Sequence, residues 1–314
     1  MPPLPQPPFD EWLIGVRAEA ISLGIREETV AKAFDGLEPV PTVIQRDRTQ
    51  AEIVQTLDEY LQQHVSRKVV QTAQRMRATH ASVLGAVSEH YGVPPGVLVA
   101  VWGLESNFGR FSGVRPTVAT LATLAYDTRR SAMFRSELFD ALRILDSGDV
   151  ELEALKGSWA GALGQPQFMP SSFLLYAQDF DGDGRRNIWS STPDVFASIA
   201  NYLAEHGWTK GQTWGREVII PDTLITRLPE VAPLQTSGCL ARRQMTAPLP
   251  LSEWNTLGVR TISRAPLPKA DIQASLIMGV KRNFLVYPNY QAILEYNCVN
   301  AYGLSVGLLG DRAR

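Results

Sequence analysis

The chain of 314 residues is 45% hydrophobic and carries 30 basic and 32 acidic residues, for a net charge of −2. This length and composition allow one large globular domain or two modest ones around a proper core. The near-zero charge argues against nucleic acid or an anionic membrane as the partner, and no apolar run is long enough to predict a membrane span.

Residues 1–8 are a proline-rich lead without the basic and apolar regions of a signal peptide. The protein is therefore expected either to stay in the cytoplasm or to have lost an export signal that preceded the given sequence. Residues 9–210 are predicted to form a helical domain. Apolar residues recur at helical spacing from Trp12 to Leu23 and between residues 57 and 89, and a short helix is expected at 27–37.

The segment 94–109 predicts an apolar helix that ends on a carboxyl group. Between Gly96 and Glu105 no other side chain is ionisable. Apolar surroundings would raise the pKa of Glu105 and make its protonated form available as a general acid. The alternative is a residue of the last helical turn that faces water.

Two further helices are predicted at 117–126 and from Ser131 to about Leu145, the second ended by Gly148. Arg129 and Arg130 lie between them. These arginines either form a solvated turn or donate hydrogen bonds to ligand oxygens.

Residues 157–173 combine three glycines, two prolines and two glutamines with apolar residues. This composition predicts a close-packed turn that presents neutral polar groups beside apolar surface, which suits a sugar better than a phosphate. A glycine-rich loop with exposed amides is the alternative.

The segment 179–189 matches the first half of an EF-hand loop, with carboxylates at loop positions 1, 3 and 5 and glycine at the position that needs a sharp turn. Position 12 is Ser190 instead of glutamate, so Asp194 is expected to close the site, with Asn187 nearby. The alternative is a solvated acidic turn neutralised by Arg185 and Arg186. The predicted ligands of a structural Ca²⁺ or Na⁺ are Asp179, Asp181, Asp183, the carbonyl of Arg185, and Asp194.

Residues 211–270 contain short β-branched segments between Pro, Gly and Thr, which predicts a small inserted β subdomain with a helical turn near 249–254. Residues 271–314 are expected to return to the catalytic body with strands at 274–278 and 284–286, a turn at 287–290, and a last helix at 301–309 capped by Asn297 or Asn300. The fold class is thus α+β, mainly α. Cys239 and Cys298 could form a disulfide or remain two buried thiols.

The C-terminal part holds the densest group of aromatic and amide side chains, Tyr290, Tyr296, Asn297 and Tyr302. Core packing explains most such tyrosines, and a sugar groove uses the same residue types. Phosphate-loop, dinucleotide, zinc-protease and serine-hydrolase motifs are absent from the sequence, and the four histidines have no obvious partner.

Three separated segments, 105–109, 161–172 and 179–189, resemble in order and spacing the lytic murein transglycosylases of the membrane-bound B type, glycoside hydrolase family 103. The similarity runs from about Phe9 to the C-terminus. Phe134 stands where a tyrosine is expected, and Pro166 replaces a glycine of other versions.

The resemblance implies a lysozyme-like helical domain with an EF-hand-like metal loop (179–194) and a small β-domain. It implies cleavage of the β-1,4 bond between N-acetylmuramic acid and N-acetylglucosamine in peptidoglycan, which leaves a 1,6-anhydro end. Glu105 matches the single catalytic acid, and no catalytic cofactor is expected. Substrate-binding roles fall on Ser158, Gln167, Tyr202, Tyr296, Asn297, Tyr302, Arg129 and Arg130.

The residues themselves also favour a mechanism with one carboxylate. A retaining glycosidase needs a second carboxylate at about 5–5.5 Å and an inverting one at about 6.5–9.5 Å, and neither neutral cleft segment contains one, although Asp127, Glu137 or Asp140 could fold close. The alternatives are a hydrolysing muramidase on the same fold and a non-catalytic wall-binding scaffold. The substrate, peptidoglycan glycan strands, implies a periplasmic protein. A monomer is expected, with unknown partners in the cell-wall machinery.

Overall fold

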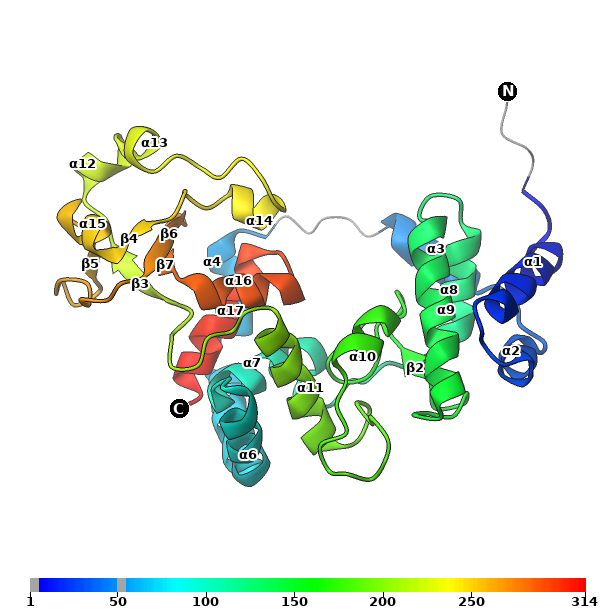
Figure 1. Cartoon of the computed structure of the whole chain (residues 1–314). Coiled ribbons are helices and arrows are strands. Elements are labelled where there is room, and N and C mark those ends of the chain that lie inside the picture. Colours follow the sequence, from blue (N-terminus) through cyan, green and yellow to red (C-terminus); the bar gives the residue numbers. More distant parts are fainter. Residues whose placement is uncertain (1–5, 50–54) are drawn as a thin grey trace. The chain divides into compact units, whose positions relative to one another are not determined.

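The computed structural model describes residues 6–49 and 55–314, and its chain divides into two compact units. The first unit comprises residues 1–52 and 105–199, and the second comprises 53–104 and 200–314. Both consist mainly of helices; the five-stranded sheet belongs to the second unit, and the first has a two-stranded sheet (Figure 1). The first five residues of the proline-rich lead lie outside the described residues.

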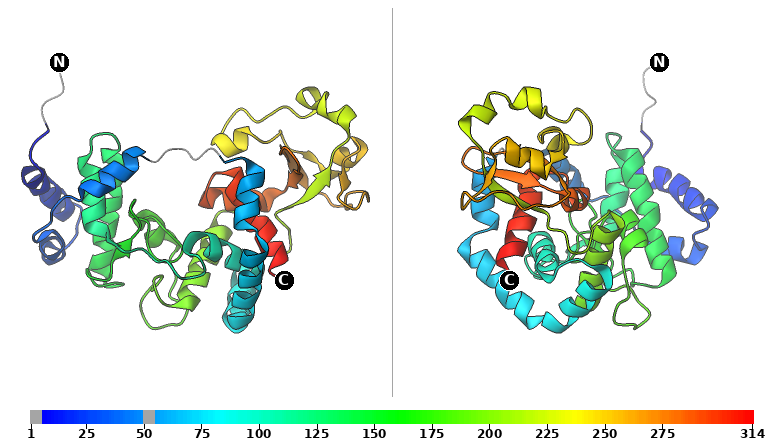
Figure 2. Two further views of the ribbon diagram at one scale, coloured as in Figure 1. Left: turned by 180° about the vertical axis from the view of Figure 1, so that it is seen from behind. Right: turned by 60° about the vertical axis from the view of Figure 1, so that its left-hand side comes forward.

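The first unit is built around a pair of helices, α8 (Thr117–Tyr126) and α9 (Ser131–Ser147), which lie side by side in both views of Figure 2. Helix α8 is buried along nearly its whole length, as its apolar sequence predicts. Both predicted helices are confirmed, and α9 ends at Gly148 in the left-handed conformation. The other helices of this unit are α1 (Phe9–Ser22), α2 (Glu27–Phe34), α3 (Pro41–Thr49), α10 (Pro170–Tyr176) and the start of α11 (Thr192–Glu205).

The second unit contains the helices α4 (Leu57–His64), α5 (Arg67–Thr79), α6 (Ala81–Tyr91), α16 (Pro288–Tyr296) and α17 (Asn300–Arg312). It also contains helix α7 (Pro95–Ser106) as far as Leu104, and the last two residues of α7 belong to the first unit. The periodic stretch predicted at 57–89 is therefore three helices, with breaks at residues 65–66 and 80. Helices α7 and α17 meet through their glycines: a Cβ on Gly96 would lie 2.3 Å from the carbonyl oxygen of Gly310. Only glycine permits this close backbone approach.

The sheet of the second unit is antiparallel and has the order β4-β6-β7-β3-β5. Its strands are β3 (Gly215–Ile219), β4 (Leu249–Pro250), β5 (Arg260–Thr261), β6 (Gln273–Met278) and β7 (Asn283–Val286), and Leu276 pairs with Leu285. Trp254 and Leu251 are central to the apolar cluster packed against it. The strands expected at 274–278 and 284–286 are confirmed, and they join the same sheet as β3.

Residues 211–270 are less strand-rich than expected, because four short helices occupy much of the segment: α12 (Asp222–Ile225), α13 (Leu228–Val231), α14 (Leu240–Arg243) and α15 (Leu251–Thr256). Strands β4 and β5 have only two residues each. The helical turn expected near 249–254 is confirmed by α15. The predicted domain boundaries at 210 and 270 stay predictions, although the sheet draws strands from both sides of residue 270.

Two expectations near the C-terminus are wrong. Residues 287–290 begin helix α16, since Pro288 suits a first helical position that needs no amide hydrogen bond. Asn297 is the C-cap of α16 and Asn300 is the first residue of α17, whose N-cap is Val299. Neither asparagine therefore caps the last helix as predicted. Within the described ranges, every helix is too short or too polar to cross a membrane.

Candidate active site

Glu105 lies in the last turn of α7, after a buried apolar run from Val97 to Val101. Its side chain is partly buried. The next residue, Ser106, is fully buried; its hydroxyl accepts the amide of Gly109 at 2.9 Å and its carbonyl accepts the amide of Phe111 at 2.9 Å. These bonds fix the end of the helix, so the backbone that carries Glu105 is held from the C-terminal side as well.

The chain leaves α7 through three consecutive residues in the left-handed region: Asn107 at φ 51°, Phe108 at 59° and Gly109 at 77°. Asparagine and glycine tolerate this conformation, whereas a phenylalanine there costs of order 1–3 kcal/mol. Backbone strain of this kind persists where the surrounding structure enforces it, often at functional sites. The strained turn is independent support for a site at Glu105.

The glycine-rich segment forms a small, tightly bonded layer. Strand β1 (Arg115–Pro116) pairs with β2 (Lys156–Gly157), and single bridges join Gly157 to Leu163 and Leu163 to Phe168. The hydroxyl of Ser158 accepts the amides of Ala160 at 3.3 Å and Ala162 at 3.1 Å. Both acceptor positions of the Ser158 hydroxyl are thus used inside the loop, and its proton remains available for a ligand.

Two glutamines behave differently in this loop. Gln165 is buried and donates from Nε2 to the carbonyl of Trp189 at 2.8 Å, which docks the loop on residues 188–189. Gln167 has φ 55° and donates from Nε2 to the carbonyl of Gly164 at 2.7 Å. The amide nitrogen of Gln167 therefore has a structural partner, and its carbonyl oxygen is the group that can accept a sugar hydroxyl.

All three acids that could have supplied a second catalytic carboxylate have local partners. Glu137 accepts both the backbone amide of Ser171 at 2.9 Å and its hydroxyl at 2.7 Å, at the start of α10. Asp140 pairs with Arg143 at 2.6 Å along α9. The third, Asp127, accepts the backbone amide of Arg129 at 3.1 Å. These contacts favour Glu105 as a single acid.

Arg129 and Arg130 are exposed in the turn between α8 and α9. Phe134, one turn into α9, is buried with 2% of its surface exposed. The roles of the two arginines in substrate binding stay predictions.

The acidic loop brings three carboxylates together: Asp179, Asp181 and Asp194 offer oxygens that lie within 4.8 Å of one another. Asp194, in the first turn of α11, is fully buried, and this burial raises its pKa more than its amide hydrogen bonds lower it. Three carboxylate oxygens that converge, one of them from a buried group, suit a hard cation such as Ca²⁺. The residues therefore fit the group that the EF-hand pattern suggested.

The other residues predicted for the metal loop have local partners. Asp183 accepts the amide of Arg185 at 2.8 Å, and the carbonyl of Arg185 accepts the amide of Asn187 at 3.1 Å. Arg186 does not neutralise the loop. It forms a two-pronged ion pair with Asp149, at 2.6 Å and 3.1 Å, and lies over the ring of Phe173. No local sequence pattern indicates this pairing, because Asp149 is 37 positions away.

In the second unit, the aromatic cluster consists of Tyr202, Tyr296 and Tyr302. The ring of Tyr296 lies 4.7 Å from that of Tyr202 and 6.5 Å from that of Tyr302, and Tyr202 also stacks on His206. Asn297, next to Tyr296, is exposed. The sequence grouped Tyr290, Tyr296, Asn297 and Tyr302; of these, the rings of Tyr296 and Tyr302 do lie together, and Tyr302 is buried.

Tyr290 belongs to the core instead. It is fully buried and donates to Asn300 at 3.2 Å, and burial raises its pKa well above the ordinary value. The cysteine question is also answered, since Cys239 and Cys298 form a disulfide with their Cα atoms 6.5 Å apart.

Residues 8–311 match the family described as the transglycosylase SLT domain. The chain belongs to this family. The membrane-bound lytic murein transglycosylase B of Escherichia coli (strain K12) is 33% identical over 223 residues, which are 70% of this chain and 57% of that protein. This SLT-domain chain thus aligns with little more than half of the length of that relative.

Solved structures extend the similarity over nearly the whole SLT-domain chain. SltB3 from Pseudomonas aeruginosa, crystallised with NAG-anhNAM-pentapeptide, is 41% identical with a TM-score of 0.88, covering 96% of this chain and 78% of that one. Slt35 from Escherichia coli, crystallised with calcium, is 27% identical with a TM-score of 0.77, covering 98% and 92%. The predicted fold class, mainly helical α+β of the lysozyme-like kind, is confirmed.

Proposed function

We propose that this protein is a lytic transglycosylase that cleaves the β-1,4 bond between N-acetylmuramic acid and N-acetylglucosamine in peptidoglycan and leaves a 1,6-anhydro end. The observation that carries the proposal is the position of Glu105, at the strained end of an apolar helix, while Glu137 and Asp140 are engaged in structural contacts. Family membership and the peptidoglycan fragments in the SltB3 crystals support the same substrate class.

In the first step, the protonated carboxyl of Glu105 donates its proton to the glycosidic oxygen as the bond from C1 breaks. The 2-acetamido group of the muramic acid stabilises the developing positive charge, which removes the need for a second protein carboxylate. In the second step, the Glu105 carboxylate takes the proton from the 6-hydroxyl as that oxygen attacks C1. Glu105 ends protonated, and no water is consumed.

The binding residues of the glycine-rich segment are neutral donors and acceptors. Ser158 donates its hydroxyl proton, since both of its acceptor positions are used in the loop, and Gln167 accepts through its carbonyl oxygen. Arg129 and Arg130 supply exposed cationic donors for substrate oxygens.

In the second unit, the partly exposed rings of Tyr202 and Tyr296 are surfaces on which sugar faces can pack, Asn297 offers an exposed amide, and the buried Tyr302 supports Tyr296 from behind rather than touching the sugar directly. Asn297 or Ser158 orients the acetamido group. The acidic loop holds a structural Ca²⁺ through Asp179, Asp181 and Asp194, with Asp183 and the carbonyl of Arg185 as further oxygen donors. The calcium in the Slt35 crystals supports this assignment.

Because the substrate lies outside the inner membrane, the protein acts in the periplasm, and we expect it to act as a monomer on glycan strands.

The test is the analysis of products from purified sacculi by mass spectrometry. Wild-type protein should release anhydromuramic acid ends, whereas reducing ends would identify a hydrolysing muramidase instead. Glu105→Gln should lower the rate by about 10²–10⁴-fold, the range of a lost general acid and base. Glu137→Gln and Asp127→Asn should keep most of the activity per folded molecule; an equal loss in either variant would contradict the one-carboxylate mechanism.

A further inference from the structure

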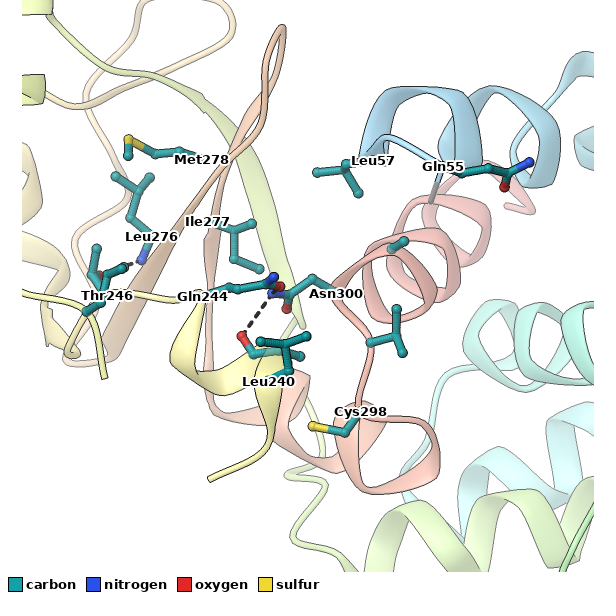
Figure 3. A pocket seen from close by; sticks show the side chains of 14 residues that line it. Gln55, Leu57, Leu240, Gln244, Thr246, Leu276, Ile277, Met278, Cys298 and Asn300 are labelled. Atoms are coloured by element: carbon teal, nitrogen blue, oxygen red, sulfur yellow. Dashed lines mark hydrogen bonds between the residues drawn. The ribbon is translucent and has the colours of Figure 1, made fainter. Parts of the chain in front are cut away.

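Helix α14 (Leu240–Arg243) is too short to be stable by itself, because one helical turn fixes several residues for very few hydrogen bonds. Leu240 is 61% exposed. A cavity of about 540 Å³ separates the helix from part of its surroundings, lined by α14, by β6 and by residues 298–301 (Figure 3). Apolar packing on this side is therefore incomplete, and other contacts must hold α14 in place.

Three polar contacts and a disulfide join α14 and its N-cap to one short stretch of chain, residues 291–300. Arg242 donates from Nε to the side-chain oxygen of Gln291 at 3.0 Å, and its Nη2 forms an ion pair with the carboxylate of Glu295. Asn300 donates from Nδ2 to the carbonyl of Ala241 at 2.9 Å (Figure 3). We call these contacts, together with the disulfide, the bracket.

The disulfide is the covalent part of the bracket. Cys239 is the N-cap of α14, and Cys298 lies in the connection between α16 and α17. The residue before Cys239, Gly238, also favours this arrangement. Gly238 has φ 87°, and a Cβ there would lie 2.9 Å from Cδ of Arg242. Glycine thus allows both the turn into α14 and the position of the arginine stem.

The bracket surrounds the two residues that carry the proposed sugar contacts of this segment. Tyr296 and Asn297 lie between Glu295 and Cys298, both of which belong to the bracket. Asn297 has left the helical conformation, with φ −152° and ψ 113°, and both it and Val299 are exposed. From α11, Tyr202 donates its hydroxyl to the carbonyl of Glu295 at 2.8 Å. Residues 296–297 are thus tied from both sides.

We infer that the bracket is a positioning device: the Cys239–Cys298 disulfide and Arg242 hold Tyr296 and Asn297 in the arrangement that binds the glycan. This inference rests on the proposed function, since it takes Tyr296 and Asn297 as sugar-binding residues. Cys239, Cys298 and Arg242 act only through these neighbours and do not touch the substrate. Breaking the bracket leaves the groups at Glu105 intact. Substrate binding should therefore weaken more than the rate of the chemical step falls.

The experiment uses the full chain with two bracket variants, the double substitution Cys239→Ala/Cys298→Ala and the single substitution Arg242→Gln. The matched control is Arg282→Gln, which removes a similar two-pronged ion pair, to Glu217, elsewhere in the second unit. For each protein, KM and kcat are measured on soluble glycan strands well below its melting temperature. Hydrogen–deuterium exchange is followed at the amides of 296–299.

Both bracket variants should raise KM roughly three- to tenfold, the effect of weakening about one sugar hydrogen bond, with kcat changed less than twofold. Exchange at 296–299 should accelerate. In Asn297→Ala, removal of the disulfide should raise KM much less than it does in the wild type, because the two changes act through one contact. The Arg282→Gln control should leave both KM and exchange at 296–299 unchanged.

Unchanged exchange at 296–299 in the double cysteine variant overturns the bracket, whether or not the wild type is active. A KM that rises equally in Arg282→Gln, or that rises additively with Asn297→Ala, overturns the positioning role, because general destabilisation would then explain it. A wild type that releases no anhydro ends instead refutes the proposed function, while the exchange comparison still decides whether the bracket orders this segment.

Discussion

The carboxylate of Asp194 accepts the backbone amide of Asn187 at 2.8 Å and so bridges the acidic loop to helix α11. Its other oxygen accepts the amide of Phe180 at 2.8 Å. The same fully buried group faces the carboxylates of Asp179 and Asp181. Three carboxylates that converge, one of them fully buried, are unfavourable unless a cation compensates their charge.

Calcium should therefore stabilise the protein. At a concentration about 100 times the dissociation constant, the free energy of unfolding should rise by about 2.7 kcal/mol, seen as a higher melting temperature than in chelator. Asp194→Asn should remove this response, and Asp222→Asn, at an exposed helix start in the second unit, should keep it. Equal melting temperatures of the wild type with calcium and with chelator would argue against a bound ion. Catalysis at a temperature where the chelated protein is folded should survive.

The pair of Arg186 and Asp149 gives a second prediction, about stability. Asp149 is nearly buried and Arg186 is about a quarter exposed. Arg186→Gln leaves the carboxylate of Asp149 without its main partner. The free energy of unfolding should therefore fall by about 2–3 kcal/mol, less than the roughly 3–5 kcal/mol lost when a fully buried pair is broken. Chemical denaturation at neutral pH measures this difference. The double variant Arg186→Gln/Asp149→Asn should recover part of the loss, since it leaves no unpaired charge.

The same pair should make stability depend on pH in a defined direction. Burial by itself would raise the pKa of Asp149, but the hydrogen bonds and the charge of Arg186 outweigh it and lower the pKa. A lowered folded pKa means that the stabilisation is complete above about pH 4 and is lost as the pH falls through the folded value. The stability gap between wild type and Arg186→Gln should thus be constant near neutrality and shrink in acid. A gap that widens in acid would contradict the assignment.

Local signals were strong enough to predict much of this protein. The apolar run before Glu105 and the helix signals around α8 and α9 depend on neighbouring residues, and those elements are confirmed. The acidic loop was recognisable because Asp179, Asp181 and Asp183 alternate along a few residues, and two of them do converge with Asp194 from the first turn of α11.

The features that could not be predicted from the sequence depend on contacts between distant residues. The pairing of Arg186 with Asp149 and the engagement of Glu137 by Ser171 leave no trace in local composition. Asn300 looked like a helix cap because asparagine favours that position. Instead it donates to Ala241, 59 positions away. Short β-branched segments predicted a strand-rich subdomain where tertiary packing also produced three unexpected short helices, α12, α13 and α14.

The hydroxyl of Tyr202 should matter for structure more than for sugar binding. Because it already donates to Glu295, Tyr202→Phe removes a hydrogen bond worth about 0.5–1.5 kcal/mol of stability and keeps the ring beside Tyr296. We expect a small fall in melting temperature with KM changed less than about threefold, whereas Tyr202→Ala, which loses the ring, should raise KM much further. Equal KM values for the two variants would contradict a stacking role.

The last prediction concerns the backbone of the glycine-rich segment. Gly164 has φ 61°, and a Cβ there would lie 2.6 Å from the carbonyl oxygen of Ile188. Gly148 also has a positive φ, 83°, but a Cβ there would meet nothing within 4 Å. Gly148→Ala should therefore cost only the left-handed conformation, about 1–2 kcal/mol, while Gly164→Ala should cost a further 1–3 kcal/mol, roughly, from overcrowding.

The activities of these two variants should separate as well. To relieve the contact with Ile188, the loop of Gly164→Ala must shift, and Gln167 shifts with it because its side chain is bonded to the Gly164 carbonyl. Its kcat/KM on glycan strands should fall at temperatures where both variants are folded, whereas Gly148→Ala should match the wild type. Equal activity in the two variants would mean that the position of Gln167 is unimportant for the reaction.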